Sequence, residues 1–67
     1  PKRRRTAPRA HGFFRTHKGY IVNLAMIQEL ESQDNGTLLL TMNYFPKEKV
    51  PVSRHYIKDF KNTLHIS

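Results

Sequence analysis

The sequence predicts a mainly β fold, built from small antiparallel β-sheets and hairpins with one short C-terminal helix. Two observations support this class: segments of β-branched and alternating apolar residues are separated by turn signals, and a helical period of apolar residues occurs near the C-terminus. With 67 residues, the chain has room for one small domain. It contains no cysteine, which excludes a disulfide framework, a thiol nucleophile and a cysteine-based zinc site.

The ordered part of the chain opens with an apolar-rich stretch over residues 13–24. Ile21 and Val22 are β-branched and favour extended structure. We expect Tyr20, Ile21 and Val22 to lie in the core rather than to form a stacking platform for bases. We expect the Asn23 side chain to bond to backbone within the fold rather than to contact a base.

A turn and a strand are predicted next. Residues 24–27 are too few for an independent helix and predict a single turn, and residues 28–32 predict a strand that directs Glu29 and Glu31 to solvent. The sequence Asp-Asn-Gly follows at 34–36. Because Asn and Gly tolerate positive φ, it predicts a tight turn between two strands.

The strongest predicted strand spans residues 37–45. Its side chains alternate between two faces, and both faces carry apolar residues, which predicts a position near the middle of the structure. We expect Tyr44 and Phe45 in the core rather than stacked on single-stranded bases. One face consists of Leu38, Leu40, Met42 and Tyr44, and the other of Leu39, Thr41, Asn43 and Phe45.

A second turn over residues 46–49 leads to a short strand with Val50 and Val52 on one face. Pro51 lies within this strand and cannot donate a hydrogen bond to a neighbouring strand, which predicts a position at the edge of the sheet. Ser53 follows directly and is a good N-cap residue for a helix.

The last helix is predicted over residues 54–64, with two stripes of side chains. Ile57, Phe60 and Leu64 form an apolar stripe. A basic stripe follows an adjacent face, and it is either a solvated surface or a ligand-binding surface. Arg54 favours the second interpretation, because it stands at the start of the helix, directly after a strand. The basic stripe contains Arg54, Lys58, Lys61 and His65.

Positive charge is concentrated at the N-terminus. The chain carries 12 Lys and Arg against 5 Asp and Glu, a net charge of +7, which points to a polyanionic partner, with nucleic acid ahead of an acidic membrane surface. Residues 1–12 show no strand or helix pattern and predict a basic flexible arm before a domain over residues 13–67. A simple linker is the alternative. Nonspecific phosphate contacts by such an arm would come from Arg3, Arg4 and Arg5.

The residue types needed for other functions are absent or badly spaced. The four histidines form no His-x-x-x-His pair and have no cysteine beside them, so we expect no metal and no cofactor. Ser53 and His55 are close in sequence, but nothing indicates the oriented base and oxyanion hole of a nucleophilic site, so we expect no enzyme. No apolar run approaches the roughly 18 residues that a membrane span needs.

Two separate motifs carry a resemblance to a known family. Residues 13–23, FFRTHKGYIVN, contain the pattern Phe-x-Arg-x-His-Lys-Gly-Tyr-Ile-Val-Asn, and residues 50–61, VPVSRHYIKDFK, contain Pro-Val-Ser-Arg-x-Tyr-Ile-Lys. In this order, with a hairpin between them, the motifs resemble those in the C-terminal two-thirds of the LytTR family of bacterial DNA-binding domains. The resemblance covers residues 13–64.

The resemblance implies roles for individual residues. The residue after the motif histidine reaches base edges in this family, which implies that Lys18 lies at the DNA. The arginine after Pro-x-Ser reads the major groove, which implies the same of Arg54, and arginine can bond bidentately to guanine O6 and N7. Further DNA contacts, mainly to the backbone, are expected from Arg15, His17, Lys58 and Lys61.

The resemblance also implies a function in transcription control. Domains of this family are usually the C-terminal output modules of response regulators, and they bind duplex DNA sequence-specifically, often as two copies on tandem repeats near promoters. A cytoplasmic protein without a membrane segment is therefore expected. Full family members carry further strands before the first motif, so we expect this fold to lack those N-terminal strands, with dimerisation or strand exchange covering the exposed edges.

Two other functions fit the sequence. The basic arm and the pI near 10.3 also suit a general nucleic-acid or RNA-binding protein, which would show no preferred DNA sequence. The missing strands also suit a protein-interaction module that the strands of a partner complete.

Overall fold

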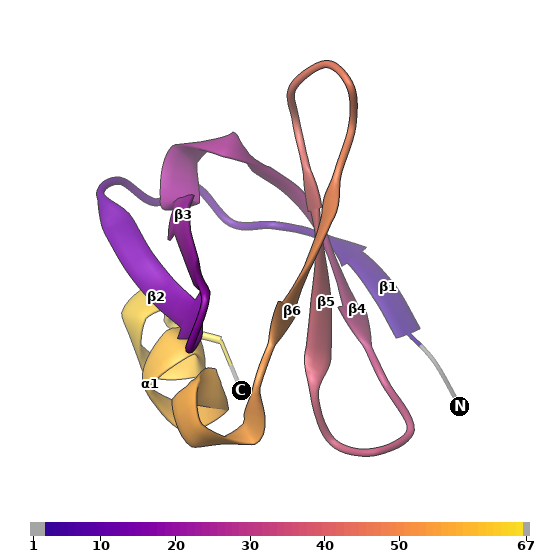
Figure 1. The fold of residues 1–67 in the computed structure, drawn as a ribbon, viewed down its shortest axis with the longest axis vertical. Helices are drawn as coiled ribbons and strands as arrows, with labels where there is room; N and C mark the ends of the chain where they lie inside the picture. Colours follow the sequence, from indigo (N-terminus) through magenta and orange to yellow (C-terminus); the bar gives the residue numbers. More distant parts are fainter. Residues whose placement is uncertain (1–2, 67) are drawn as a thin grey trace.

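The computed structural model describes residues 3–66 and contains two antiparallel sheets and one α-helix (Figure 1). The elements are β1 (Arg3–Thr6), β2 (Phe13–His17), β3 (Tyr20–Asn23), the 3-10 helix η1 (Leu24–Met26), β4 (Ile27–Ser32), β5 (Leu38–Met42), β6 (Lys49–Val52) and α1 (Arg54–Leu64). The larger sheet has the strand order β1-β4-β5-β6, and the smaller one pairs β2 with β3. This confirms the predicted mainly β class. Within residues 3–66, no helix has the length and apolar character needed to cross a membrane.

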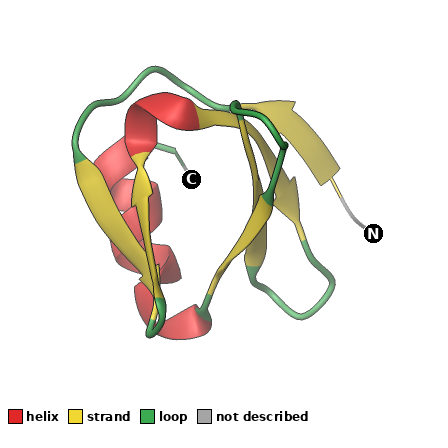
Figure 2. Ribbon diagram, turned by 45° about the horizontal axis from the view of Figure 1, so that its top comes forward, coloured by secondary structure: helices red, strands yellow, loops and turns green. Residues whose placement is uncertain are grey.

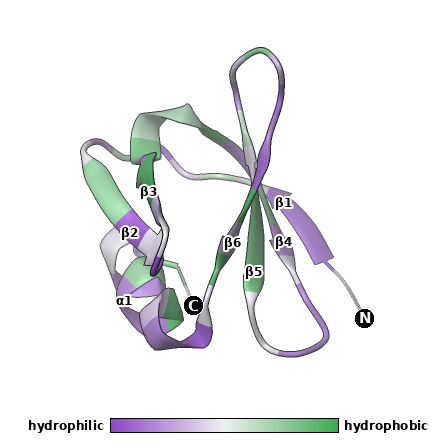
Figure 3. Ribbon diagram, in the orientation of Figure 1, coloured by the Kyte–Doolittle hydropathy of each residue, from purple (hydrophilic) through white to green (hydrophobic). Residues whose placement is uncertain are grey.

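One hydrophobic core joins the four-stranded sheet, the β2–β3 hairpin and α1, which packs behind the hairpin in Figure 2. Phe60 of α1 is fully buried, and its ring meets that of Phe14 edge-on at a centroid distance of 5.5 Å, which ties the helix to β2. Figure 3 shows that β5 is largely apolar and β1 hydrophilic. The buried apolar residues are Val22, Leu24, Ile27, Leu30, Leu38, Leu40, Met42, Val50, Val52, Phe60 and Leu64.

Several predicted elements are confirmed at the central and C-terminal strands. The single turn after β3 is η1, where Asn23 Oδ1 accepts a hydrogen bond of 3.0 Å from the Ala25 N–H, so Asn23 bonds to backbone as predicted. β5 pairs with β4 on one side and β6 on the other, which confirms its interior position. β6 stands at the edge of the sheet, as Pro51 predicts.

α1 begins and ends at the predicted residues. Phe60 and Leu64 are buried and Ile57 is half-buried, which confirms the apolar stripe. Ser53 occupies the N-cap position with an extended backbone, but its side chain makes no capping hydrogen bond within the described residues. Its backbone N–H instead donates to the carbonyl oxygen of Thr16 in β2 at 2.8 Å.

Tyr44 and Phe45 lie outside the core, so the prediction for them was wrong. β5 ends just before Asn43, whose backbone N–H donates to the Met26 carbonyl at 2.6 Å, and the chain leaves the sheet there. Tyr44 is consequently 43% exposed and Phe45 97% exposed. The Tyr44 hydroxyl donates to the Glu48 carboxylate at 3.4 Å, and partial desolvation together with this carboxylate raises the pKa of Tyr44.

The β2–β3 hairpin is covered on one face only, which corrects the prediction for Tyr20 and Ile21. Val22 lies on the covered face and is buried, as predicted. Ile21 faces the opposite way and is 62% exposed, and Tyr20 is 45% exposed at the start of β3. Successive side chains of a strand point to opposite faces, which explains why Ile21 is exposed beside the buried Val22. Tyr20 has the same parity as Val22 but lies at the turn end of the strand.

Residues 3–6 form the strand β1, where the sequence predicted a flexible arm without a strand. β1 pairs antiparallel with β4, and Arg4 lies opposite Glu31 and Thr6 opposite Glu29. All four residues of β1 are exposed. An exposed edge strand needs no alternating apolar residues, so its sequence carries no strand pattern.

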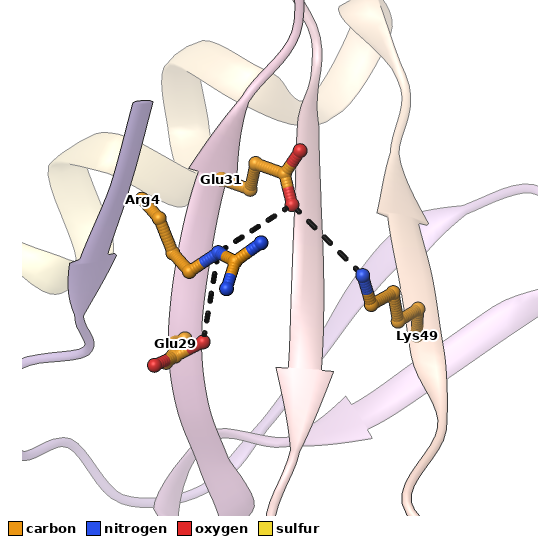
Figure 4. A network of polar contacts seen from close by, with 4 residues as sticks. All are labelled: Arg4, Glu29, Glu31 and Lys49. Carbon is orange, nitrogen blue, oxygen red and sulfur yellow. Dashed lines mark ion pairs between the residues drawn. The ribbon is translucent and has the colours of Figure 1, made fainter. Parts of the chain in front are cut away.

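A network of charged side chains covers the outer face of the larger sheet (Figure 4). Arg4 Nε lies 4.0 Å from a carboxylate oxygen of both Glu29 and Glu31, and Lys49 Nζ lies 4.0 Å from Glu31. The Glu31 side chain is only 13% exposed. The sequence predicted that Glu31 points freely to solvent. In the structure its side chain is instead partly covered, with two cationic neighbours beside it.

Candidate nucleic-acid interface

Two segments that are far apart in the sequence meet at one end of the molecule. The hydrogen bond from Ser53 N–H to the Thr16 carbonyl fastens the end of β2 to the start of α1. Lys18 follows Thr16 by two residues, and Arg54 follows Ser53 directly. The β2–β3 turn and the first turn of α1 lie at the lower end of the molecule in Figure 1 and in Figure 2. The two predicted base-reading residues, Lys18 and Arg54, therefore share this end.

Short-range contacts shape the β2–β3 turn. The register of the β2–β3 pairing shifts between Arg15 and His17, and Arg15 Nη1 donates to the Lys18 carbonyl at 3.1 Å. The Gly19 N–H donates to His17 Nδ1 at 3.3 Å, and the His17 ring meets the Tyr20 ring edge-on at a centroid distance of 5.6 Å. The Lys18 side chain is exposed and forms no hydrogen bond or ion pair with any described residue. Arg15 and His17 thus hold a turn that presents Lys18.

Arg54 is exposed at the start of α1 and contacts a third segment. Its Nη2 donates to the backbone carbonyl of Asn35 at 2.8 Å, in the turn between β4 and β5. Arginine has five N–H donors, so one such bond leaves the others for a ligand. The sequence gives no signal for this contact, because every residue has a backbone carbonyl and no side-chain pattern marks the one to which Arg54 donates.

The basic stripe of α1 leads away from this end. At a rise of about 1.5 Å per residue, Lys58 lies about 6 Å and Lys61 about 10 Å farther along the helix axis than Arg54. Lys58 is exposed, whereas Lys61 is half-buried. Lys58 is therefore close to the end that carries Lys18 and Arg54, and Lys61 is more distant from it.

The arginines of β1 lie in a different part of the molecule. β1 is three strands from β6 in the sheet, about 14 Å at the usual strand spacing of about 4.8 Å. Arg4 lies within 4.0 Å of two carboxylates, which partly compensate its charge. The structure therefore does not group Arg3, Arg4 and Arg5 with Lys18 and Arg54.

Metal ligation has no candidate group in the described part of the chain. Among residues 3–66, no three His, Asp or Glu side chains are arranged to hold a metal ion. The candidate interface consists of basic and hydrogen-bonding side chains.

These features define a small β-rich domain that presents basic residues from a hairpin turn and from the start of a helix at one end. The family model of the LytTr DNA-binding domain matches residues 6–65. The chain therefore belongs to the LytTR family and is a DNA-binding domain of that family. The match begins at Thr6, within β1, ahead of the first motif at Phe13.

Curated relatives support the same assignment. The sensory transduction protein LytT of Enterococcus faecalis is 42% identical over 55 residues, which are 82% of this chain and 22% of that protein. The transcriptional regulatory protein YpdB of Escherichia coli is 41% identical over 59 residues, 88% of this chain and 23% of that protein. The sensory transduction protein LytT of Bacillus subtilis is 41% identical over 54 residues, which are 81% of this chain and 22% of that protein. The matched part is thus less than a quarter of each relative. No solved structure matches the chain.

Proposed function

We propose that this domain binds duplex DNA sequence-specifically in transcription control, and that Lys18 and Arg54 read base edges in the major groove. The main support is the hydrogen bond between Ser53 and Thr16, which joins the turn bearing Lys18 to the helix start bearing Arg54. Arginine bonds bidentately to guanine O6 and N7, and lysine can donate to the same atoms. Two exposed cationic side chains at one end suit the electronegative groove of a duplex.

The other basic residues would contact the sugar–phosphate backbone. Such contacts set the register and orientation of a protein on DNA, while base contacts provide the specificity. Arg15 and His17 precede Lys18 at the end of β2, and Lys58 lies one helical turn beyond Arg54, with Lys61 farther along the helix. Nonspecific attraction from the far edge of the sheet would come from Arg3, Arg4 and Arg5.

We further propose that the domain is the output module of a bacterial response regulator that acts in the cytoplasm. The names of the relatives, transcriptional regulatory and sensory transduction proteins, support this role. Those relatives are several times as long as the matched segment. Two copies would bind tandem repeats near a promoter, with a homodimer as the assembled form, and no catalytic step is required of this domain.

Selection of bound duplexes from a random-sequence pool tests the proposal. We expect enrichment of a defined sequence. The enriched duplex should then compete better than a scrambled duplex or a structured RNA at about 150 mM salt, where nonspecific attraction is screened. Equal competition by all three would contradict sequence-specific reading and support a general nucleic-acid binder. No binding to any of them would favour a protein-interaction module.

A further inference from the structure

We propose that the β4–β5 turn positions the Arg54 guanidinium for base reading, with Asn35 as the positioning residue; this inference rests on the proposed function. The Asn35 carbonyl accepts a hydrogen bond of 2.8 Å from Arg54 Nη2, between residues 19 positions apart. Both residues are exposed. The Arg54 side chain makes no other hydrogen bond or ion pair with the described residues, so this contact orients the guanidinium in the free protein.

The turn that supplies the carbonyl is itself held by hydrogen bonds. Asn35 Oδ1 accepts from the Thr37 N–H at 3.2 Å and from the Thr37 hydroxyl at 2.6 Å. The Gln33 N–H donates to the Thr37 carbonyl at 2.9 Å, and the Gly36 N–H donates to the Gln33 carbonyl at 3.1 Å. Gly36 has a φ of 84°, which glycine adopts without strain. The direction of the Asn35 carbonyl is therefore well determined.

The backbone of Arg54 is held at the same time. The preceding residue, Ser53, is tied to Thr16 in β2 by its backbone N–H. Because the bond to β2 holds the backbone next to Arg54 and Asn35 holds its guanidinium, few rotamers remain open to the Arg54 side chain. An ordered side chain loses less conformational freedom on binding, and a planar guanidinium with a set direction discriminates better between base edges.

The bond to Asn35 is compatible with reading guanine. It uses one of the five N–H donors of Arg54 and leaves four in the plane of the guanidinium. A bidentate contact to guanine O6 and N7 needs two of these. The turn therefore orients the guanidinium without occupying the donors that base reading requires.

The test is a double-mutant cycle between Asn35→Ala and Arg54→Ala. Asn35→Ala removes the side-chain oxygen that accepts two of the four hydrogen bonds within the turn and keeps the backbone. Fluorescence anisotropy would measure affinity for the selected duplex and for a scrambled one. We expect Asn35→Ala to weaken binding to the selected duplex by about five- to tenfold and to change the affinity for the scrambled duplex by no more than about twofold. In the Arg54→Ala background, Asn35→Ala should have no further effect on either affinity. Asn35→Ser, which can re-form a weaker side-chain turn, should restore part of the affinity.

A matched control and a readout without DNA complete the experiment. Asn43→Ala, at an exposed asparagine in the β5–β6 loop, should change neither affinity. In the free protein, the NMR order parameter of Arg54 Nε should fall from a rigid value toward about 0.6 in Asn35→Ala. If Asn35→Ala does not fold, Thr37→Val, which removes one of the two hydrogen bonds to Asn35 Oδ1, gives the same readouts.

Each other outcome identifies what failed. If Arg54→Ala reduces binding to the selected duplex and Asn35→Ala does not, the positioning role is wrong and the proposed function stands. If the effect of Asn35→Ala persists in the Arg54→Ala background, the turn contacts DNA itself and the positioning role is again wrong. If Arg54→Ala has no effect on the selected duplex, base reading by Arg54, and with it the proposed mode of recognition, is wrong.

Discussion

The backbone N–H of Ser53 donates a hydrogen bond of 2.8 Å to the carbonyl oxygen of Thr16. This bond connects the two motifs that characterise the sequence. The first, residues 13–23, spans the β2–β3 hairpin, and the second, residues 50–61, runs from β6 into α1. Because donor and acceptor both belong to the backbone, the connection does not depend on either side chain. It keeps Lys18 and Arg54 at the same end of the domain, which is the geometric basis of the proposed DNA interface.

Replacing Arg54 should reduce specificity more than overall affinity. Arg54→Ala is expected to weaken binding to the selected duplex by about 1–3 kcal/mol and to affect scrambled DNA much less. Arg54→Lys keeps the charge but lacks the planar guanidinium, so it should retain scrambled-DNA binding and lose much of the discrimination. Titrations with both duplexes measure this. Lys47→Ala, in the loop at the opposite end of the molecule, is the control (Figure 1).

A different outcome for Arg54 would change its assignment. Equal weakening of binding to the selected and the scrambled duplex by Arg54→Ala would make this residue a phosphate contact without a role in base reading.

The β1 arginines should act through nonspecific electrostatics. Substituting Arg3, Arg4 and Arg5 with Ala is expected to weaken binding to selected and scrambled DNA alike. The slope of log K against log salt concentration should decrease by about 0.9 for each phosphate that the variant no longer neutralises. Titrations at several salt concentrations measure the slope. An unchanged slope would show that β1 completes the sheet and does not contact phosphates.

Thr16 offers a stability test in the core. Its side chain is fully buried, and its hydroxyl oxygen has no hydrogen-bond partner among the described residues. Valine has nearly the same shape without the hydroxyl, so Thr16→Val should raise the free energy of unfolding by about 1 kcal/mol. Urea denaturation measures the change. DNA affinity should be unaffected, because the Thr16 carbonyl remains; a loss of stability would mean that the hydroxyl is hydrogen-bonded.

Two phenylalanines provide a matched pair for testing the core. Phe60 is fully buried against Phe14, whereas Phe45 is 97% exposed. Phe60→Ala is expected to lower the free energy of unfolding by about 3–5 kcal/mol, enough to unfold much of a domain of this size. Phe45→Ala should change it by less than about 0.5 kcal/mol. Thermal unfolding followed by circular dichroism compares the two variants, and similar destabilisation of both would contradict the observed core.

Local patterns were sufficient to predict most of the elements. The alternation around Leu38 and Leu40, the Asp-Asn-Gly turn and the apolar stripe ending at Leu64 each depend on neighbouring residues. These signals correspond to β5, the β4–β5 turn and α1 in the structure. Pro51 likewise predicted the edge position of β6, because a missing N–H is a property of the residue itself.

The wrong predictions concern residues whose environment depends on distant parts of the chain. Ile21 is as apolar as Val22, yet one is exposed and the other buried, because the helix covers a single face of the hairpin. Tyr44 and Phe45 extend an apolar pattern, but the backbone bond between Asn43 and Met26 takes the chain out of the sheet before them. Pattern alone does not contain these long-range contacts.

Composition and charge alone indicated a polyanionic partner. The resemblance carried by two motifs then implied a DNA-binding domain and pointed to Lys18 and Arg54, because those motifs are read directly from the sequence. The tertiary structure alone shows that these two residues share one end of the molecule, that β1 forms an edge of the larger sheet, and that Arg54 donates to the Asn35 carbonyl. Each of those relationships depends on a backbone group: the first two join backbone to backbone, and in the third a side chain donates to a backbone carbonyl. Such groups are the same in every residue, so only the folded chain determines which of them meet.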